Sequence, residues 1–378
     1  MPLRADEQDA LRRRCTIVVS GHGEEPPGAE LARLAEWCRQ HGWHADRYGE
    51  GALIGAFEAR VAALLGKPAA VFMPSGTMAQ QIALRIACER ANNFTIAMHP
   101  TSHLELHEER AYARLHSLRA TLLGERERPT SARDLGDLAD APAALLIELP
   151  AREIGGLLPA WHELAAMMAL ARERGIWRHM DGARLWEARE YYAPASYADI
   201  CAQFDSVYVS FYKGIGALAG AMLAGPEDFI SEARVWRRRH GGTLVQLHPL
   251  VASAAMRFEG QLAKMASYRS RAVAFAESLR DIDGLSVQPT PPQVNLFHLH
   301  LDAPAEALTA ARDRIAGEHG AWLAPRFSSD PGPGRASAEI YVGDSLLAMP
   351  PENDRSVLAP LYAKMVDVAR SGAPAVSR

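Results

Sequence analysis

Apolar positions along the chain follow two spacings, one typical of helices and one of strands. Residues 51–66 carry apolar side chains at helical spacing, 68–74 form an apolar run of strand length, and 77–91 return to helical spacing. The same pattern predicts strands at 94–98, 143–149, 176–180, 205–211 and 218–224, and a helix at 163–175 that Gly175 ends. Such alternation predicts a mostly parallel sheet with helices on both faces and ligands at the carboxyl ends of the strands.

The last third of the chain has a different pattern. A helical stretch from about residue 249 to residue 280 precedes a strand at 294–301, where polar residues alternate with apolar ones as in a half-exposed sheet. Loops are predicted at 317–320 and 328–334 from their glycine, proline and serine residues. We therefore expect an N-terminal segment (1–45), a large α/β domain (46–250) and a smaller C-terminal α+β domain (251–378).

Composition narrows the classes of function. The chain has 378 residues, and 48% of them are apolar, which suffices for a large core. A net charge of −4 gives no electrostatic case for nucleic acid, and four cysteines without close spacing disfavour a zinc site. No apolar run approaches the roughly 20 residues of a membrane helix, and the polar N-terminus is unlike a signal peptide. We expect a cytoplasmic protein with no metal, nucleic-acid or membrane partner.

One lysine lies between an apolar strand pattern and a run of small residues. The segment DSVYVSFYKGIGALAGAMLAG carries Lys213 at the end of the predicted strand 205–211. An ammonium group in such surroundings is costly to desolvate, so its pKa falls and the free amine becomes a nucleophile. A Schiff-base lysine requires this property; the alternative is a solvated lysine at a strand end.

An aspartate lies about thirty residues earlier, at the end of another predicted strand. Asp181 in WRHMDGARLWEA follows the apolar stretch 176–180. Pyridoxal phosphate (PLP) acts as an electron sink only while its ring nitrogen stays protonated, and a buried aspartate supplies the counter-charge. An aspartate upstream of a lysine, each at a strand end, is the order that PLP chemistry on a doubly wound sheet would use.

A third segment has the features of a phosphate site. VFMPSGTMAQQIALRIA predicts a strand, a tight turn and a helix, with Ser75, Gly76 and Thr77 at the start of the helix. Backbone N–H groups and hydroxyls at such a position bind phosphate, although an ordinary N-cap has the same residues. Ser210, three residues before Lys213, would offer another hydroxyl.

These segments resemble the threonine aldolase branch of the PLP-dependent fold-type I enzymes (the PLP-dependent transferase-like fold), which is close to the β-eliminating lyases. The resemblance lies in PSGTMA, in HMDGAR, and in the lysine followed by Gly-x-Gly-Ala. DRYGEG and SHLELHEERAY are also similar to family segments, and the resemblance covers most of residues 15–260. It implies PLP as the cofactor, a small amino acid as the substrate, and a homodimer or homotetramer.

The resemblance also implies a role for each matching residue. Lys213 would bond to the cofactor aldehyde, Asp181 would pair with the pyridine nitrogen, and His103 would stack on the ring. The remaining roles fall on three residues: Arg184 beside the cofactor's phenolic oxygen and the substrate carboxylate, Tyr48 at the cofactor phosphate of a neighbouring subunit, and Glu108 as a proton relay near His103.

Each of these residues has a structural alternative. His103 belongs to a cluster of four histidines, any of which would be an ordinary exposed helix residue. Arg184 would instead pair with Glu187 three residues later on a helix surface. Glu108 lies in HEER, which is also typical of a solvated helix face.

The chain departs from the family at positions near the substrate. Glu339 lies where a late strand of the threonine aldolases carries a carboxylate-binding arginine, and Arg335 or Arg326 would have to replace it. Pro150 and Ala151 follow Glu148 where the family has threonine and a histidine used near the cleaved bond. In addition, Val245 lies at a position where the family commonly has arginine. The cofactor site is therefore expected to be intact and the substrate site altered.

The sequence thus predicts a PLP-dependent lyase, similar to threonine aldolase, that cleaves a β-hydroxy-α-amino acid to glycine and an aldehyde. The nearest alternative is another PLP reaction on a small amino acid, such as β-elimination, racemisation or transamination. A nicotinamide oxidoreductase is disfavoured because GIGALAG, from Gly214 to Gly220, lacks the GxGxxG spacing. A binding protein that keeps the cofactor site without turnover is the third alternative.

Overall fold

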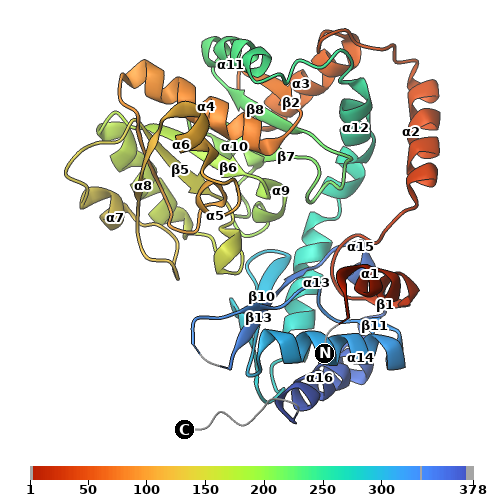
Figure 1. Ribbon diagram of the computed structural model, residues 1–378. Coiled ribbons are helices and arrows are strands. Elements are labelled where there is room, and N and C mark those ends of the chain that lie inside the picture. Colours follow the sequence, from red (N-terminus) through yellow and green to blue (C-terminus); the bar gives the residue numbers. More distant parts are fainter. Residues whose placement is uncertain (1–2, 333, 372–378) are drawn as a thin grey trace. The chain divides into compact units, whose positions relative to one another are not determined.

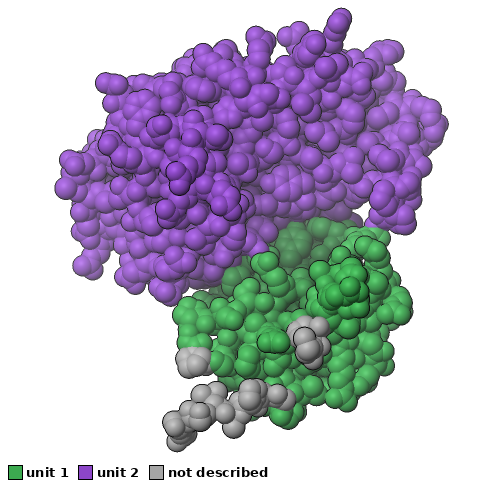
Figure 2. Space-filling view, in the orientation of Figure 1, with its two compact units in different colours: residues 1–24, 265–378 green, residues 25–264 purple. Residues whose placement is uncertain are grey.

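The computed structural model describes residues 3–332 and 334–371. These residues form two compact units (Figure 2). The larger unit comprises residues 25–264, and the smaller one joins the N-terminal residues up to 24 with those from 265 onward. The two segments of the smaller unit are therefore far apart in the sequence.

The larger unit is built on a seven-stranded sheet (Figure 1). Its strand order is β2-β8-β7-β6-β5-β3-β4. The five strands from β7 to β4 run parallel, whereas β8 is antiparallel to both of its neighbours. The strands are β2 (Ala69–Met73), β3 (Thr95–Met98), β4 (Arg119–Leu122), β5 (Ala144–Glu148), β6 (Trp177–Gly182), β7 (Ser206–Ser210) and β8 (Ala221–Gly225).

Helices pack on both faces of this sheet. Val71 and Met73 face a core shared with helix α4, and Phe72 between them points to the opposite face because strand residues alternate. On that face Phe72 stacks on Phe211, whose ring also contacts Phe57 of α3. The helices are α2 (Pro27–His41), α3 (Ala52–Leu64), α4 (Gly76–Ala91), α5 (His103–Leu106), α6 (Ala111–His116), α7 (Ala132–Gly136), η1 (Arg152–Ile154), α8 (Trp161–Glu173), α9 (Leu185–Ala188), α10 (Tyr197–Cys201), α11 (Glu227–Arg239) and α12 (His248–Leu262).

The smaller unit has an antiparallel sheet of order β12-β13-β10-β9 and a two-stranded parallel pair, β1 and β11. Its core includes Phe275, Phe297 and Tyr362 from two helices and the sheet. The elements are α1 (Ala5–Arg14), β1 (Ile17–Val18), α13 (Met265–Ser278), β9 (Leu285–Gln288), β10 (Leu296–Leu301), α14 (Ala305–His319), β11 (Ala321–Trp322), β12 (Ser328–Ser329), β13 (Ala336–Tyr341), α15 (Asp344–Leu347), η2 (Asp354–Leu358) and α16 (Ala359–Ser371).

The predicted fold class is confirmed, and the local differences have simple causes. All seven strands predicted from the apolar pattern are present within one or two residues at each end, apart from the start of the 218–224 strand, which begins at Ala221. The helical stretch 249–280 is two helices, α12 and α13. The loop predicted at 317–320 is wrong for its first three residues, because α14 continues to His319 and only Gly320 has the left-handed backbone that ends the helix. Within the described ranges, none of the helices has the length and apolar character needed to cross a membrane.

Candidate active site

Two carboxylates lie side by side at the carboxyl edge of the large sheet. Glu148 ends β5, Asp181 lies near the end of β6, and the parallel register places them on directly adjacent positions. Asp181 is 1% exposed, and Glu148 is partly buried. Burial, together with the charge of Asp181, raises the pKa of Glu148 to about 7. The pair therefore places two carboxyl groups, one of which keeps its proton up to near-neutral pH, where a parallel sheet binds its ligands.

Hydrogen-bond donors hold the Asp181 carboxylate. The Ala183 N–H donates to Oδ1 at 3.0 Å, and the side-chain amide of Gln80 donates to Oδ2. Burial raises the pKa of Asp181, whereas the charge of Lys213 and the Ala183 hydrogen bond lower it. These donors and Lys213 favour the charged carboxylate against the cost of burial.

Behind Asp181, a chain of buried polar groups crosses from the sheet to α4. The Gln80 carbonyl oxygen lies 3.0 Å from His179 Nε2, and His179 Nδ1 lies 2.8 Å from the Ser206 hydroxyl. Trp177 Nε1 donates to the same hydroxyl at 2.8 Å. Burial lowers the pKa of His179 to about 3, so the ring is neutral, with the Nε2 proton donated to Gln80. Each group along the chain is satisfied, which orients the Gln80 amide toward Asp181.

Lys213 lies in the loop between β7 and β8, in electrostatic reach of both carboxylates. Burial is the main cause that lowers its pKa, and the charge of Arg184 lowers it further. Asp181 and Glu148 oppose this shift. The lysine is thus a partly buried amine with a weakened hold on its proton, as a nucleophilic lysine requires.

The predicted phosphate segment forms the start of α4. Ser75 is the N-cap, and its hydroxyl accepts a hydrogen bond from the Met78 N–H at 3.3 Å. Gly76 and Thr77 are the first two helical residues. The first N–H groups of a helix have no partner inside the helix, so this end is available to an anion.

The close surroundings of this helix start fit a phosphate group. A Cβ on Gly76 would collide with the Tyr208 hydroxyl of β7, so glycine is required for this approach. The Ser210 hydroxyl at the end of β7 is fully buried and makes no hydrogen bond of good geometry within the described residues. A bound phosphate would use that hydroxyl together with the helix N–H groups.

His103 and Glu108 lie together at the same edge. His103 Nδ1 lies 3.0 Å from Glu108 Oε1, and Gln81 donates to the other carboxylate oxygen at 3.0 Å. His103 and Glu108 both act electrostatically on Asp181. The two adjacent glutamines of α4 thus hold the two buried carboxylates, Gln80 at Asp181 and Gln81 at Glu108.

The remaining predicted residues differ in placement. Arg184 immediately precedes α9 and its charge acts on Lys213, so it belongs to this group. Tyr48 is 50% exposed, has a left-handed backbone (φ 54°), and donates its N–H to the Val245 carbonyl at 2.9 Å. None of the contacts found among the described residues connects Tyr48 with Lys213.

The sequence reasoning missed several groups around the site. Arg152 on η1 lowers the pKa of Lys213, and its N–H donates to Glu148 at 3.2 Å. Gln80 and His179 were also missed. Two adjacent glutamines between the apolar residues 78–79 and 82–84 of α4 were the available signal, since buried amides need partners.

The positions that depart from the family have their own partners. Glu339 lies on β13, and its carboxylate is 4.0 Å from His298 on the adjacent strand. Arg335 pairs with Asp302 at 3.0 Å, and Arg326 is exposed.

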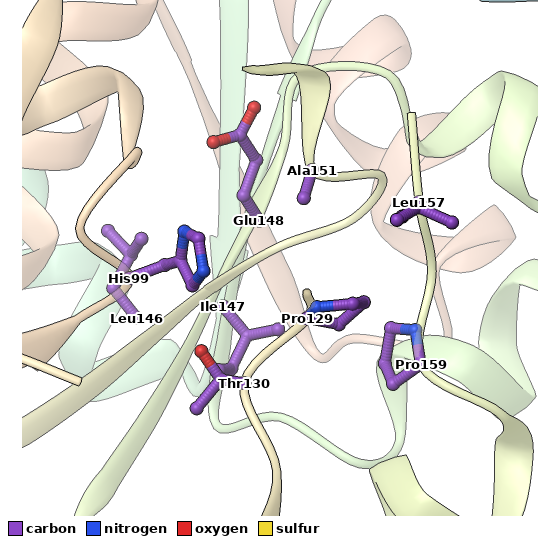
Figure 3. A pocket seen from close by; sticks show the side chains of 9 residues that line it. All are labelled: His99, Pro129, Thr130, Leu146, Ile147, Glu148, Ala151, Leu157 and Pro159. Carbon is purple, nitrogen blue, oxygen red and sulfur yellow. The ribbon is translucent and has the colours of Figure 1, made fainter. Parts of the chain in front are cut away.

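A small cavity lies beside β5 (Figure 3), lined by His99, Pro129, Thr130, Leu146, Ile147, Glu148, Ala151, Leu157 and Pro159. Its volume of about 20 Å³ holds about one water molecule. The Glu148 carboxylate points away from the two prolines (Figure 3). His99 uses both ring nitrogens, toward the Thr101 hydroxyl at 2.7 Å and the Glu125 carbonyl at 2.7 Å, so it is a structural histidine.

The fold and the site together define a class of protein. A mostly parallel sheet brings an aspartate, a lysine and a helix start to the same edge, and no cluster of three or more potential metal ligands occurs in the described part of the chain. This arrangement fits PLP, with a carboxylate for its ring nitrogen, an amine for its aldehyde and N–H groups for its phosphate. The class is the PLP-dependent proteins of fold type I.

Comparison with known proteins identifies the family. The model of the β-eliminating lyase family matches residues 43–302, and the chain belongs to this family, whose members are PLP-dependent lyases. A structure from Listeria monocytogenes assigned as an L-allo-threonine aldolase is 38% identical, with a TM-score of 0.88 over 96% of this chain and 98% of that chain. The Leishmania major threonine aldolase, 17% identical with a TM-score of 0.72 over 92% of this chain and 99% of that chain, shows the fold alone.

Curated relatives are more distant. The low specificity L-threonine aldolase of Escherichia coli K12 is 29% identical over 62% of this chain and 72% of its own length. The aldolase vrtJ of Penicillium aethiopicum is 33% identical over 65% of this chain and 64% of its own length. An uncharacterised Caenorhabditis elegans protein is 30% identical over 62% of this chain and 58% of its own length. The match thus spans less than two thirds of the last two relatives.

Proposed function

We propose that this protein is a PLP-dependent aldehyde-lyase that cleaves a β-hydroxy-α-amino acid to glycine and an aldehyde. The observation that carries the proposal is the electrostatic grouping of Asp181, Lys213, Arg184 and His103 at one edge of the sheet. The likeness to the Listeria protein assigned as an L-allo-threonine aldolase supports the choice of reaction.

The residues that hold the cofactor follow from the site. Lys213 would bond to the cofactor aldehyde, Asp181 would keep the ring nitrogen protonated, and His103 would stack on the ring. Its phosphate would lie on the α4 start at Ser75, Gly76 and Thr77, with the Ser210 hydroxyl beside it. When bound, PLP supplies an electron sink for a bond at the substrate's Cα.

The substrate would be oriented by charge. The planar guanidinium of Arg184 binds a carboxylate through two parallel hydrogen bonds, which fixes the amino acid relative to the lysine. Glu108, hydrogen bonded to His103 Nδ1, would relay protons at this edge.

The nearest alternative is another PLP reaction on a small amino acid, namely β-elimination, racemisation or transamination. It is favoured by Ala151, which lies where the family has a histidine near the cleaved bond. Product analysis with a panel of amino acids separates these reactions from aldol cleavage.

We also propose a cytoplasmic homo-oligomer in which Tyr48 reaches the cofactor phosphate of a neighbouring subunit. Its half-exposed ring supports this assignment, because a second copy has access to it.

Two measurements test the function. Purified protein incubated with PLP should gain a visible absorbance band that Lys213→Ala loses, and L-threonine or L-allo-threonine should then release glycine. If the band forms without release of glycine from any β-hydroxy amino acid, the aldolase assignment is wrong and the cofactor assignment stands. If the protein stays colourless, both are wrong.

A further inference from the structure

A hydrogen-bonded pair lies beside the position where the family's histidine is replaced. The segment that carries Ala151 continues into η1, and Glu153 of η1 lies 2.8 Å from His107 Nε2. The ring of His107 lies 5.2 Å from the ring of His103, centroid to centroid. A different histidine is thus attached to the same segment and lies next to a residue of the site.

The partners of Glu153 connect this pair to the reacting group. Arg152 donates to Glu153 at 2.7 Å, and the charge of Arg152 acts on Lys213. The imidazole of His107 therefore lies near His103 and is bonded to Glu153, which also accepts from Arg152. Its side chain is 36% exposed, so a small substrate has access to it.

We propose that His107, held by Glu153, binds the β-hydroxyl of the substrate and accepts its proton during cleavage. This inference rests on the proposed function. In the neutral tautomer that donates its Nε2 proton to Glu153, the lone pair is on Nδ1, which makes no hydrogen bond within the described residues. His107 thereby takes the role of the family's histidine, whose position in this chain is occupied by Ala151.

The β-hydroxyl proton passes to His107 Nδ1, the oxygen forms the aldehyde carbonyl, and the Cα–Cβ bond breaks. PLP, when bound, would supply the sink for the electron pair of that bond, and a proton that reaches Cα would then give glycine. One proton leaves oxygen and one reaches carbon, so no oxidant or further reactant is required.

Other histidines of the same cluster are less suited to this role. His103 directs Nδ1 to Glu108 and is assigned to the cofactor ring, and His99 uses both nitrogens. His116 is buried, stacks on His240, and has its pKa lowered by burial to about 4. Of the two histidines among these four that a carboxylate holds, His107 has the more exposed side chain, 36% against 29% for His103, and it is not assigned to the cofactor ring.

The test compares His107→Phe with Glu153→Gln and with His162→Phe, a control on the exposed surface of α8. Three quantities are measured on the cofactor-loaded protein. The first two are the rate of cleavage of L-allo-threonine and L-threonine, and the rate of exchange of the glycine Cα proton in heavy water. The third is the equilibrium affinity for L-serine relative to L-alanine, obtained from the spectrum of the bound cofactor. Glycine exchange requires the cofactor and Lys213 without any β-hydroxyl, so it reports on the rest of the site.

We expect His107→Phe to lower kcat for cleavage about 100-fold or more, the usual contribution of a general base, with glycine exchange within about twofold of the parent. Its preference for serine over alanine should disappear, since the hydroxyl loses its partner. Glu153→Gln should lower kcat about tenfold, since the orienting charge is lost. His162→Phe should match the parent.

Three outcomes overturn the inference. Cleavage by His107→Phe at the parent rate shows that His107 is not the base. An equal fall in cleavage and glycine exchange shows that the change disturbs the whole site; His107→Asn, which is smaller and polar, must then show the selective loss or the inference fails. If the parent cleaves no β-hydroxy amino acid, the proposed function fails, and this inference with it.

Discussion

Gln80 joins Asp181 to His179: its amide donates to the Asp181 carboxylate, and its carbonyl oxygen accepts from His179 Nε2 at 3.0 Å. The three residues come from two elements, since Gln80 lies on α4 and the other two on β6. The start of α4 also forms the candidate phosphate site. Under the proposed function, one helix would therefore position both the counter-charge for the cofactor ring and the N–H groups for its phosphate.

Gln80→Leu should weaken both the fold and the cofactor site. The substitution removes the partner of a buried N–H on His179 and a donor to Asp181, and each buried polar group left unpaired costs about 1–3 kcal/mol. We expect the free energy of unfolding to fall by about 2 kcal/mol in urea titrations and cofactor affinity to fall at least about tenfold. Gln40→Leu, at an exposed i+4 hydrogen bond on α2, should change stability by less than about 0.5 kcal/mol. Equal effects of the two changes would contradict the role of Gln80.

Gly76→Ala tests the close approach of α4 to β7. Its Cβ would meet the Tyr208 hydroxyl, so α4 must shift and the phosphate site widens. We expect a loss of about 1–3 kcal/mol in stability together with weaker cofactor binding. Gly55→Ala, on α3 with open space around its Cβ, should be neutral or stabilising by up to about 1 kcal/mol. Tyr208→Phe combined with Gly76→Ala should recover part of the loss, and no recovery would show that contact with Tyr208 is not the cause.

Local signals in the sequence were sufficient for the sheet and for the main residues of the site. Asp181, Lys213 and Ser75 each lie where an apolar run ends, and parallel strands bring such ends to one edge. Contacts between segments far apart in the sequence could not be predicted from these local patterns. Gln80 and Asp181 are 101 residues apart, and His107 and Glu153 are 46 apart, so that only the folded chain shows which carboxylate each meets.

Glu148 should make stability depend on pH. Its pKa in the folded protein is raised from 4.5 to about 7, so between these values the folded state binds more protons than the unfolded state, and stability falls as pH rises. Glu148→Gln removes this titration while keeping an acceptor for the Arg152 N–H. On protein freed of cofactor, we expect the variant to gain about 3 kcal/mol relative to the parent between pH 4.5 and 7.5. Glu173→Gln, at an exposed position on α8, is the matched control. A gain in stability for Glu148→Gln that does not grow with pH would refute the raised pKa of Glu148.

Tyr48 should act on a neighbouring subunit. If each site takes Lys213 from one subunit and Tyr48 from the other, a mixed dimer of Tyr48→Ala and Lys213→Ala chains has one intact site and one doubly altered site. Random exchange of equal amounts makes half of the dimers mixed, so about a quarter of the parent activity should return although each variant alone is weak. The mixture is unfolded and refolded together, and glycine release is compared with that of the unmixed variants. A mixture no more active than the sum of the two unmixed variants would place Tyr48 in the same site as the Lys213 of its own subunit, or outside the site. A size measurement that shows a fully active monomer would exclude a shared site altogether.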